Sequence, residues 1–433
     1  MVEVQEALPP AGCGQSPQTL RRSVFSKHSE RRKRKMCRFA RNAWIDWQPE
    51  TLSGGLSPKE KLPMNKKIIA AGHICLDITP VFPSQLRAEN IAQVLEPGKL
   101  IHMKEADVHT GGSVANTGLA LKILGADVQL MGKVGGDAFG SMVESILAGY
   151  GAGGLIVDEG SSTSYSVVLA VPGIDRIFLH NPGANDTFSN ADIPEEALAD
   201  AALFHFGYPP LMKKIYQNGG AELTAIFRRM KERGIATSLD LAAVDPNSEE
   251  GREDWQQILS GVLPWTDFFV PSFEELCFML DRPAYDRLAA LGGDMSTHLS
   301  MERDVKPLAD KCLAMGCKAV LIKCGLSGMY YRTADASAMA QVGDRLELDA
   351  SLWASAEGVQ PCFRADQVLS GTGAGDTSIA AFLMAAAQGK APAQCAALAA
   401  AEGACAVTAY DALSGLKQLS ELEARIASGW ETM

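Results

Sequence analysis

The sequence lacks several features that mark whole classes of protein. No apolar run in its 433 residues approaches the length of a membrane-spanning helix, and the longest are alanine-rich pieces such as IAAFLMAAA. The N-terminus has no apolar segment of the signal-peptide type. The ten cysteines include no CxxC pair and no histidine at zinc-ligand spacing. We therefore expect a cytoplasmic protein with reduced thiols and no membrane partner.

Positive charge is scarce except near the N-terminus. A formal net charge of −11 argues against a general nucleic-acid-binding protein. Residues 1–63 are different, because up to Lys61 they hold twelve Lys and Arg against six Asp and Glu. This basic extension could tether nucleic acid or an acidic surface. A disordered tail, or sequence upstream of the true start codon, is the favoured alternative, because MNKKIIAAGHICLDITP from Met64 resembles a natural start.

From residue 64 to residue 433, strand-like and helix-like patterns alternate. The strand-like runs are KKIIAAGHICLD, DVQLMGKVG, ALFHFG, IATSLDL, TDFFVP and KAVLIKCG, and helical spacing follows in GGSVANTGLALKILG and DAFGSMVESILAGYG. This rhythm predicts one α/β domain with a mostly parallel sheet and helices on both of its faces. Two other segments alternate like half-exposed strands, and we expect them to form a lid from about 78–110 and 161–182.

The stretch LSGTGAGDTSIAAFLMAAAQGK, residues 369–390, joins a glycine-rich turn, an aspartate and a helix. Gly371, Gly373 and Gly375 allow main-chain amides to converge, and a helix start adds free N–H donors and partial positive charge. Such a site binds anions, most often phosphate. Asp376 at its mouth suits a base that acts beside the phosphate. The alternative is that Asp376 only caps the helix.

Three familiar nucleotide-binding motifs do not fit. GADVQLMGKV has six residues where the Walker loop needs four, and it lacks the following Ser or Thr. GTGAGD has an aspartate where a dinucleotide fingerprint ends in glycine, and it lies near the C-terminus. The HRD and DFG motifs of protein kinases are absent from the sequence.

Two separated glycine motifs form a pattern together. HTGGSVANTGLALKILGADVQLMGKVGGDAFG, residues 109–140, has a GG pair, an asparagine four residues later, a helix and a closing GDAFG, and GAGD follows far downstream. Over about residues 64–425 the chain resembles the ribokinase-like, phosphofructokinase-B-type carbohydrate kinases. The resemblance implies a three-layer α/β/α fold with a small β-strand lid. It also implies ATP-dependent phosphorylation of a primary or anomeric hydroxyl of a small sugar.

The resemblance also assigns roles to residues that match the first motif. Asp77 in GHICLD would hold sugar hydroxyls, Gly111 and Gly112 would let the backbone approach the sugar, and Asn116 would bond a hydroxyl. A turn-forming role is the alternative for Asp77. The alternative for Asn116 is a buried helix residue that caps its own turn.

At the second motif, Asp376 would be the general base that takes the proton of the attacking hydroxyl. The backbone amides of Gly373, Ala374 and Gly375 would form the anion hole for the transferred phosphoryl group, where preorganised donors are effective. This would make the four residues the catalytic centre.

The remaining residues that the resemblance implies would bind the nucleotide. IKCGLSG would supply Lys323, Gly325 and Gly328 to ATP, and a plain hairpin turn is the alternative for the two glycines. Asp240 in TSLDLAA lies where many relatives have an asparagine near the phosphates. Glu275 in VPSFEEL would help to place Mg²⁺, which neutralises the phosphate oxygens in this chemistry.

Several departures from the family pattern leave the substrate open. Ribokinases have Asn where this chain has Cys75 and Lys where it has Ser113, although NPGANDTF (181–188) looks ribokinase-like. Ser272 replaces the asparagine of the NxxE element, and Ser370 and Gly371 replace the usual DT, which puts the monovalent-cation site in doubt.

Two other functions fit the same residues, namely a nucleoside kinase on this fold and a non-catalytic sugar or nucleotide sensor. The expected ligands are a small sugar and ATP, and a homodimer through the lid is compatible with the family.

Overall fold

The computed structural model describes residues 66–433, except 84–85, 87–90 and 175. The basic extension expected over residues 1–63 lies outside the described residues. Among the described helices, none is long and apolar enough to cross a membrane.

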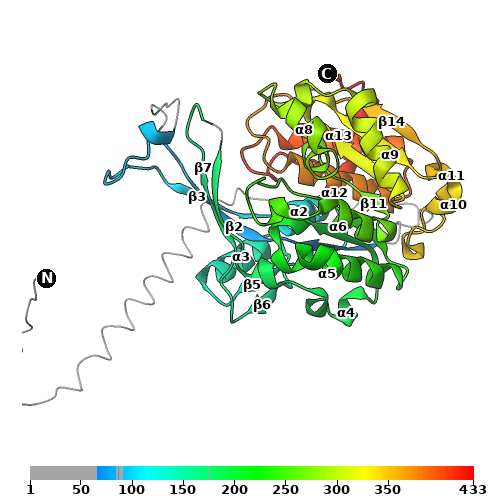
Figure 1. Cartoon of the computed structure of the whole chain (residues 1–433), viewed down its shortest axis with the longest axis horizontal. Helices are drawn as coiled ribbons and strands as arrows, with labels where there is room; N and C mark the ends of the chain where they lie inside the picture. Colours follow the sequence, from blue (N-terminus) through cyan, green and yellow to red (C-terminus); the bar gives the residue numbers. More distant parts are fainter. Residues whose placement is uncertain (1–65, 84–85, 87–90, 175) are drawn as a thin grey trace, which may run out of the picture. The chain divides into compact units, whose positions relative to one another are not determined.

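An eight-stranded sheet forms the centre of the described domain (Figure 1). Its strand order is β14-β13-β12-β11-β10-β9-β1-β4. In that order the strands are Glu357–Gln360, Met329–Thr333, Ala319–Lys323, Phe268–Phe269, Ala236–Leu239, Ala201–Gly207, Lys67–Gly72 and Val128–Met131. The six strands from β12 to β4 are parallel, and β13 and β14 are antiparallel. The predicted mostly parallel sheet is therefore confirmed.

Helices cover both faces of this sheet. One layer contains α5 (Lys213–Lys231, kinked at residues 217–220), α6 (Trp255–Val262), α7 (Phe273–Leu280) and α9 (Lys306–Ala314). The other contains α2 (Ser113–Ile123), α12 (Ala374–Ala387), α13 (Pro392–Ala406) and α14 (Leu419–Ala427). Shorter or peripheral helices are α3 (Ala138–Gly149), α4 (Glu195–Leu198), α8 (Arg282–Ala289), α10 (Ala336–Met339) and α11 (Ala350–Trp353).

Neighbouring strand residues divide between the two helix layers. Ile69 of β1 and Phe269 of β11 pack in the core cluster on the α5 side, whereas Ile68 and Phe268 pack in the cluster on the α12 side. Successive side chains of a strand point to opposite faces. Because both faces are buried, the strands are continuous apolar runs, and the three-layer α/β/α fold is confirmed.

A separate four-stranded sheet forms the lid, in the order β3-β2-β7-β8 (Figure 1). Its strands are Ala106–Gly111, Cys75–Pro80, Tyr165–Leu169 and Ile177–Asn181. The prediction that KKIIAAGHICLD is one strand was wrong, because β1 lies in the large sheet and β2 in the lid. At Gly72 the backbone has φ +123°, and a Cβ there would lie 2.2 Å from the Gly207 oxygen, so the chain turns at this glycine.

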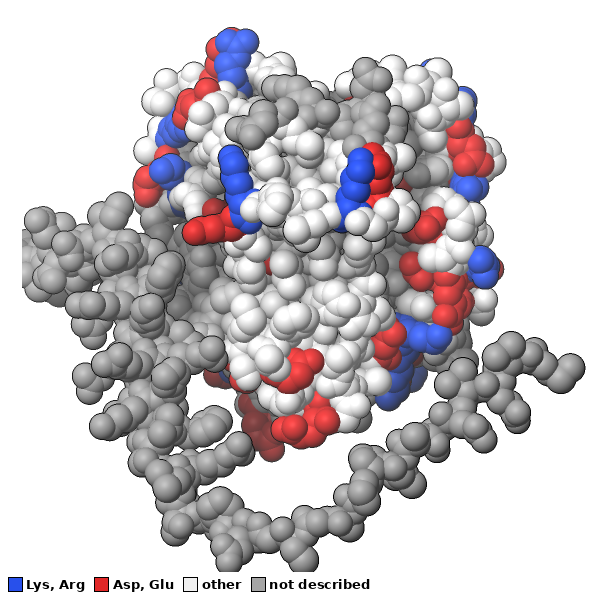
Figure 2. Space-filling model, turned by 90° about the vertical axis from the view of Figure 1, so that its left-hand side faces the viewer, with Lys and Arg blue, Asp and Glu red and all other residues white. Residues whose placement is uncertain are grey.

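DVQLMGKVG is also divided, since β4 belongs to the large sheet and β5 (Lys133–Gly135) pairs with β6 (Ile156–Asp158). Figure 2 shows one face of the molecule, where uncharged side chains fill a broad central area. Acidic and basic side chains lie in the upper half of this face and along its sides, and the described residues in this view do not gather into a basic patch.

Candidate active site

The carboxyl ends of neighbouring parallel strands supply one group of polar residues. Tyr208 follows β9, Asp240 follows β10, Ser272 lies after β11, and Lys323 ends β12. All four line a cavity of about 730 Å³, together with Gly373 at the start of α12. Open α/β sheets bind their ligands at this edge, where the loops after the strands diverge. The fold therefore brings the second glycine motif to the usual ligand position.

Asp376 lies buried in the first turn of α12, and its carboxylate receives hydrogen bonds from three other side chains. The Tyr208 hydroxyl lies 2.8 Å from both carboxylate oxygens. Asn116 Nδ2 donates over 3.1 Å, and Thr117 Oγ1 donates over 3.3 Å. The N-cap of the helix is Gly373. Asp376 is therefore not a capping residue, and the capping alternative was wrong.

The protonation of Asp376 is set by opposing effects. Burial raises the pKa of this carboxyl above its ordinary value, while the hydrogen bond from Tyr208, the charge of Lys323 and the bonds from Asn116 and Thr117 act in the opposite direction. A raised pKa makes a carboxylate a better proton acceptor, and the donors keep its oxygens oriented. The geometry therefore suits a general base.

The glycine turn before α12 presents backbone to the cavity. Gly373 has φ +73°, and a Cβ at this position would lie 2.2 Å from Ala412 Cβ, so a glycine is required there. Gly375 is exposed, and a Cβ added at this residue would lie 3.8 Å from Lys323 Nζ. The first amides of a helix have no intrahelical acceptor. Amides and an ammonium group are thus close enough to act on one anion.

Lys323 and Asp240 form an ion pair inside the cavity. Lys323 Nζ lies 2.8 Å from Asp240 Oδ1, and both side chains are largely buried. Burial opposes the charge of the ammonium, but the carboxylates of Asp240, Glu275 and Asp376 outweigh it and raise the pKa of Lys323. The ammonium group therefore keeps its proton at neutral pH.

Two of the predicted nucleotide elements also have local structural roles. Ser272 and Glu275 form a capping box at the start of α7, in which the Ser272 amide donates to Glu275 Oε2 over 2.9 Å. Gly325 and Gly328 lie in the connection between the antiparallel strands β12 and β13, so a hairpin turn describes them correctly. All four residues nevertheless line the 730 Å³ cavity. Among the described residues, no group of three or more His, Cys, Asp or Glu side chains has the arrangement of a metal site.

The residues of the first motif meet where the lid joins the domain. Asp77 lies inside β2, so it is not a turn residue, and Cys75 Sγ donates to its Oδ1 over 3.2 Å. A Cβ at Gly111 would lie 2.2 Å from Asp77 Oδ2, so this glycine makes room for the carboxylate. Gly112 is the N-cap of α2, and Asn116 points to Asp376 rather than capping its own turn. The lining of the 730 Å³ cavity, as far as the described residues show, contains none of the predicted sugar residues.

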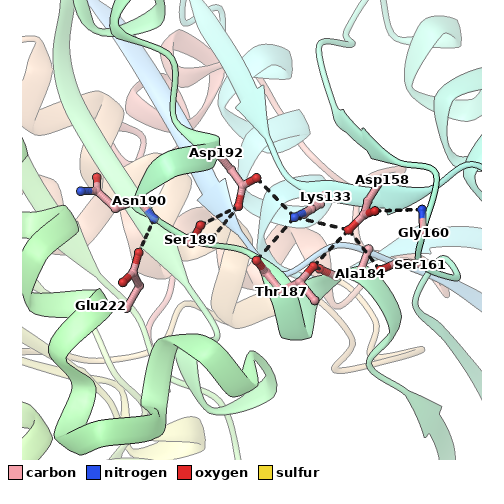
Figure 3. Close-up of polar contacts among 10 residues, drawn as sticks. All are labelled: Lys133, Asp158, Gly160, Ser161, Ala184, Thr187, Ser189, Asn190, Asp192 and Glu222. Carbon is pink, nitrogen blue, oxygen red and sulfur yellow. Dashed lines mark hydrogen bonds and ion pairs between the residues drawn. The ribbon is translucent and has the colours of Figure 1, made fainter.

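A polar network beside this corner fixes the neighbouring loops (Figure 3). Lys133 Nζ lies between Asp158 and Asp192, at 3.5 Å and 3.3 Å, and also contacts the Thr187 carbonyl. In the same segment, Asn185 Nδ2 donates to the Ile74 carbonyl over 2.9 Å, and the Ile74 amide donates back to Asn185 Oδ1. The NPGANDTF stretch thus holds the backbone between β1 and β2 in place.

Sequence reasoning missed Tyr208, Thr117, His73 and His180. Tyr208 stands between the end of β9 and two prolines, in FGYPP, and its left-handed backbone (φ +64°) is uncommon for a bulky residue. His73 follows Gly72 at the turn between the two sheets. Neither Tyr208 nor His73 belongs to a glycine motif, so only the place of each residue in the folded chain indicates a role.

Comparison with known proteins identifies the family. A family model described as pfkB family carbohydrate kinase matches residues 74–419. The chain belongs to this family. Among curated proteins, this pfkB-family chain is 29% identical over 192 residues to fructokinase-1 of Oryza sativa subsp. japonica, which covers 43% of the chain and 54% of the rice protein. It is 24% identical over 306 residues to an uncharacterized sugar kinase of Archaeoglobus fulgidus, covering 69% of the chain and 98% of that protein.

Solved structures show the same fold. The fructokinase of Xylella fastidiosa with bound ATP matches with a TM-score of 0.60 and 21% identity, over 84% of this chain and 99% of that one. The ribokinase of Arabidopsis thaliana complexed with ribose and ATP has a TM-score of 0.58 and 20% identity, over 83% and 98%. The pfkB-family chain spans only a little more than half the length of the curated fructokinases from rice and Zea mays, at 54% and 56%. The ribokinase-like fold predicted from the sequence is confirmed.

Proposed function

We propose that the protein catalyses ATP-dependent phosphorylation of a hydroxyl group of a small sugar. One observation carries the proposal. The buried carboxylate of Asp376, held by Tyr208, Asn116 and Thr117, lies in the first turn of a helix whose glycine start lies beside Lys323, and we propose that this start binds the transferred phosphate. A base next to a phosphate site is what phosphoryl transfer to a hydroxyl requires.

The chain's own residues would act in sequence. Asp376 takes the proton of the sugar hydroxyl as the oxygen forms a bond to the γ-phosphorus of ATP, and the bond to the departing ADP breaks. The amides at Gly373–Gly375 and the Lys323 ammonium stabilise the charge that develops on the transferred phosphoryl oxygens. The proton on Asp376 then leaves to solvent when the products depart.

The 730 Å³ cavity is the proposed ATP site. It has the volume of a small-molecule pocket, and the residues assigned to the nucleotide line it. In support, structural neighbours with the same fold contain ATP, and a putative ribokinase II from E. coli contains ATP and Mg²⁺. Glu275 supplies a carboxylate at this cavity and would help to place Mg²⁺, which neutralises the phosphate charge in this chemistry, and Asp240 would lie near the phosphates.

The sugar is proposed to bind at the base of the lid, near Asp77 and the Gly111–Gly112 turn. Asn116 would then orient Asp376 in addition to meeting the sugar, because its amide already donates to that carboxylate. The curated relatives include fructokinases, which makes D-fructose the first sugar to test. Cys75, which replaces the asparagine of ribokinases, instead donates to Asp77 and argues against assuming ribose.

ATP consumption with Mg²⁺ should be measured across D-fructose, D-ribose, sugar acids, adenosine and inosine, with Asp376→Asn alongside. We expect one sugar to give turnover, and Asp376→Asn to lower kcat by roughly 10²–10⁴, or about 3–5 kcal/mol of activation free energy. Asp376→Asn keeps the shape of the side chain, so circular dichroism should remain that of the wild type. Turnover of a nucleoside alone would replace the sugar proposal, and binding without turnover across the panel would indicate a sensor.

A further inference from the structure

His73 lies at the turn between the large sheet and the lid, and its ring is buried without partners. The side chain is 2% exposed, and neither Nδ1 nor Nε2 has a hydrogen-bond partner among the described residues. The backbone of His73, in contrast, is fully engaged, because its amide donates to the Gly207 carbonyl over 3.2 Å and its carbonyl accepts from the Val114 amide over 3.1 Å. A buried polar group without a partner destabilises the folded state, and native structures contain few.

The ring of His73 lies close both to Tyr208 and to the lid. Its centroid is 6.1 Å from that of Tyr208, whose hydroxyl contacts Asp376, and 5.3 Å from that of His180 on β8. Gly112 flanks the ring, because a Cβ there would lie 2.6 Å from His73 Nδ1. The unpaired Nδ1 therefore lies beside Gly112, in the corner proposed for the sugar.

The chemistry of this corner favours a neutral ligand. Burial, with a smaller contribution from His180, lowers the pKa of His73 to about 3, so the ring is uncharged and offers one donor and one acceptor. A hydroxyl group also offers both. The carboxylates whose charges act on His180 are those of Asp77, Asp186 and Glu250.

The ammonium group of Lys213 does not reverse this charge. Lys213 acts on Asp186, but its Nζ is paired with Glu249 over 2.6 Å. The carboxylates of Asp77, Asp186 and Glu250 thus act on His180, which lies beside His73, and we expect them to repel a negatively charged group on the sugar.

We propose that His73 is a specificity-determining residue whose ring nitrogens hydrogen-bond a hydroxyl of an uncharged sugar, so that the site selects neutral polyols over sugar acids and sugar phosphates. This inference rests on the proposed sugar kinase function. It adds the class of substrate and the residue that recognises this class. It also accounts for the buried, unpaired nitrogens of the His73 ring, since the sugar hydroxyl would supply their missing hydrogen-bond partners.

The first test replaces the ring by an apolar side chain of similar size. His73→Leu loses no hydrogen bond of the described structure, so its melting temperature should equal or exceed that of the wild type. His205→Leu is the matched control, because His205 is also fully buried but its Nδ1 pairs with Ser238 Oγ over 3.0 Å, and its loss should lower the melting temperature. A clear fall in melting temperature for His73→Leu would assign the ring a structural role and overturn the inference.

The second test measures kinetics with D-fructose and D-ribose as neutral probes and D-gluconate and D-fructose 6-phosphate as anionic ones. For the neutral sugar that turns over, His73→Leu should raise KM roughly 10- to 100-fold, with KM for ATP unchanged. His73→Gln, which keeps a donor and an acceptor, should recover part of the loss. An unchanged sugar KM, or a wild-type preference for an anionic probe, would contradict the inference.

Absence of turnover in the wild type would reject the proposed function without deciding the role of His73. Sugar binding is then measured by the shift of melting temperature at high sugar concentration. A neutral probe that stabilises the wild type but not His73→Leu would support the inference. No stabilisation of the wild type by either neutral sugar would overturn it.

Discussion

The hydroxyl of Tyr208 lies 2.8 Å from both carboxylate oxygens of Asp376, although 168 residues separate the two in the chain. Burial and the neighbouring carboxylates of Asp376 and Asp240 raise the pKa of the Tyr208 hydroxyl well above its ordinary value, so it stays protonated and donates. A tyrosine in a left-handed backbone conformation thereby holds the proposed base in one orientation.

Tyr208→Phe should lower kcat roughly 10- to 100-fold, because it removes a hydrogen bond to a charged group. The lost donor had lowered the pKa of Asp376, so that pKa should rise in the variant. The base acts only when ionised, and the acid limb of the profile of kcat/KM against pH should therefore move to higher pH. Tyr331→Phe on β13, outside the cavity lining, is the control. A uniform loss at every pH, with the acid limb unmoved, would contradict the effect of Tyr208 on the pKa of Asp376.

Lys323→Met should destabilise the protein as well as weaken ATP binding. The change leaves the buried Asp240 carboxylate without its cation, which costs about 3–5 kcal/mol when one partner of a buried pair is removed. The double variant with Asp240→Asn removes the unpaired carboxylate charge, so it should recover most of the unfolding free energy measured in urea. Its KM for ATP should remain raised. Equal stability of the single and double variants would show that the unpaired Asp240 carboxylate is not the cause of the loss.

Gly373→Ala and Gly375→Ala should separate folding from catalysis. Alanine at position 373 would place its Cβ 2.2 Å from Ala412 Cβ in a positive-φ conformation, so we expect a loss of roughly 1–3 kcal/mol in unfolding free energy. At Gly375 the nearest atom to a new Cβ is Lys323 Cε at 3.7 Å, an ordinary contact. Gly375→Ala should fold like the wild type but lose about tenfold in kcat/KM, because the methyl group enters the proposed anion site. Wild-type activity in Gly375→Ala would exclude that position from the site.

Glu402→Gln should stabilise the protein at alkaline pH. Burial raises the pKa of Glu402 in α13 to about 8. A folded-state pKa above the unfolded value gives stability that is complete below the unfolded pKa and is lost as pH rises through 8. The gain in melting temperature of Glu402→Gln over the wild type should thus be larger at pH 9 than at pH 5. An equal difference at both pH values would show that Glu402 does not titrate within this range.

The sequence alone determined the fold class and the proposed catalytic centre, for a local reason. Buried parallel strands are continuous apolar runs, and the glycine turn, Asp376 and the helix after it are contiguous, so short windows of sequence contain the whole signal. Gly373, Asp240, Lys323 and Glu275 follow from the same kind of motif and meet in one cavity.

Tertiary structure decided what lies around that centre. Asn116 and Asp376 are 260 residues apart, and only the packing of α2 beside α12 makes the amide a donor to the carboxylate. Tyr208 and His73 follow strands β9 and β1, which are adjacent in the sheet but not in the chain. No local pattern marks such residues, because hydrogen-bond partners and desolvation depend on side chains that arrive from distant segments.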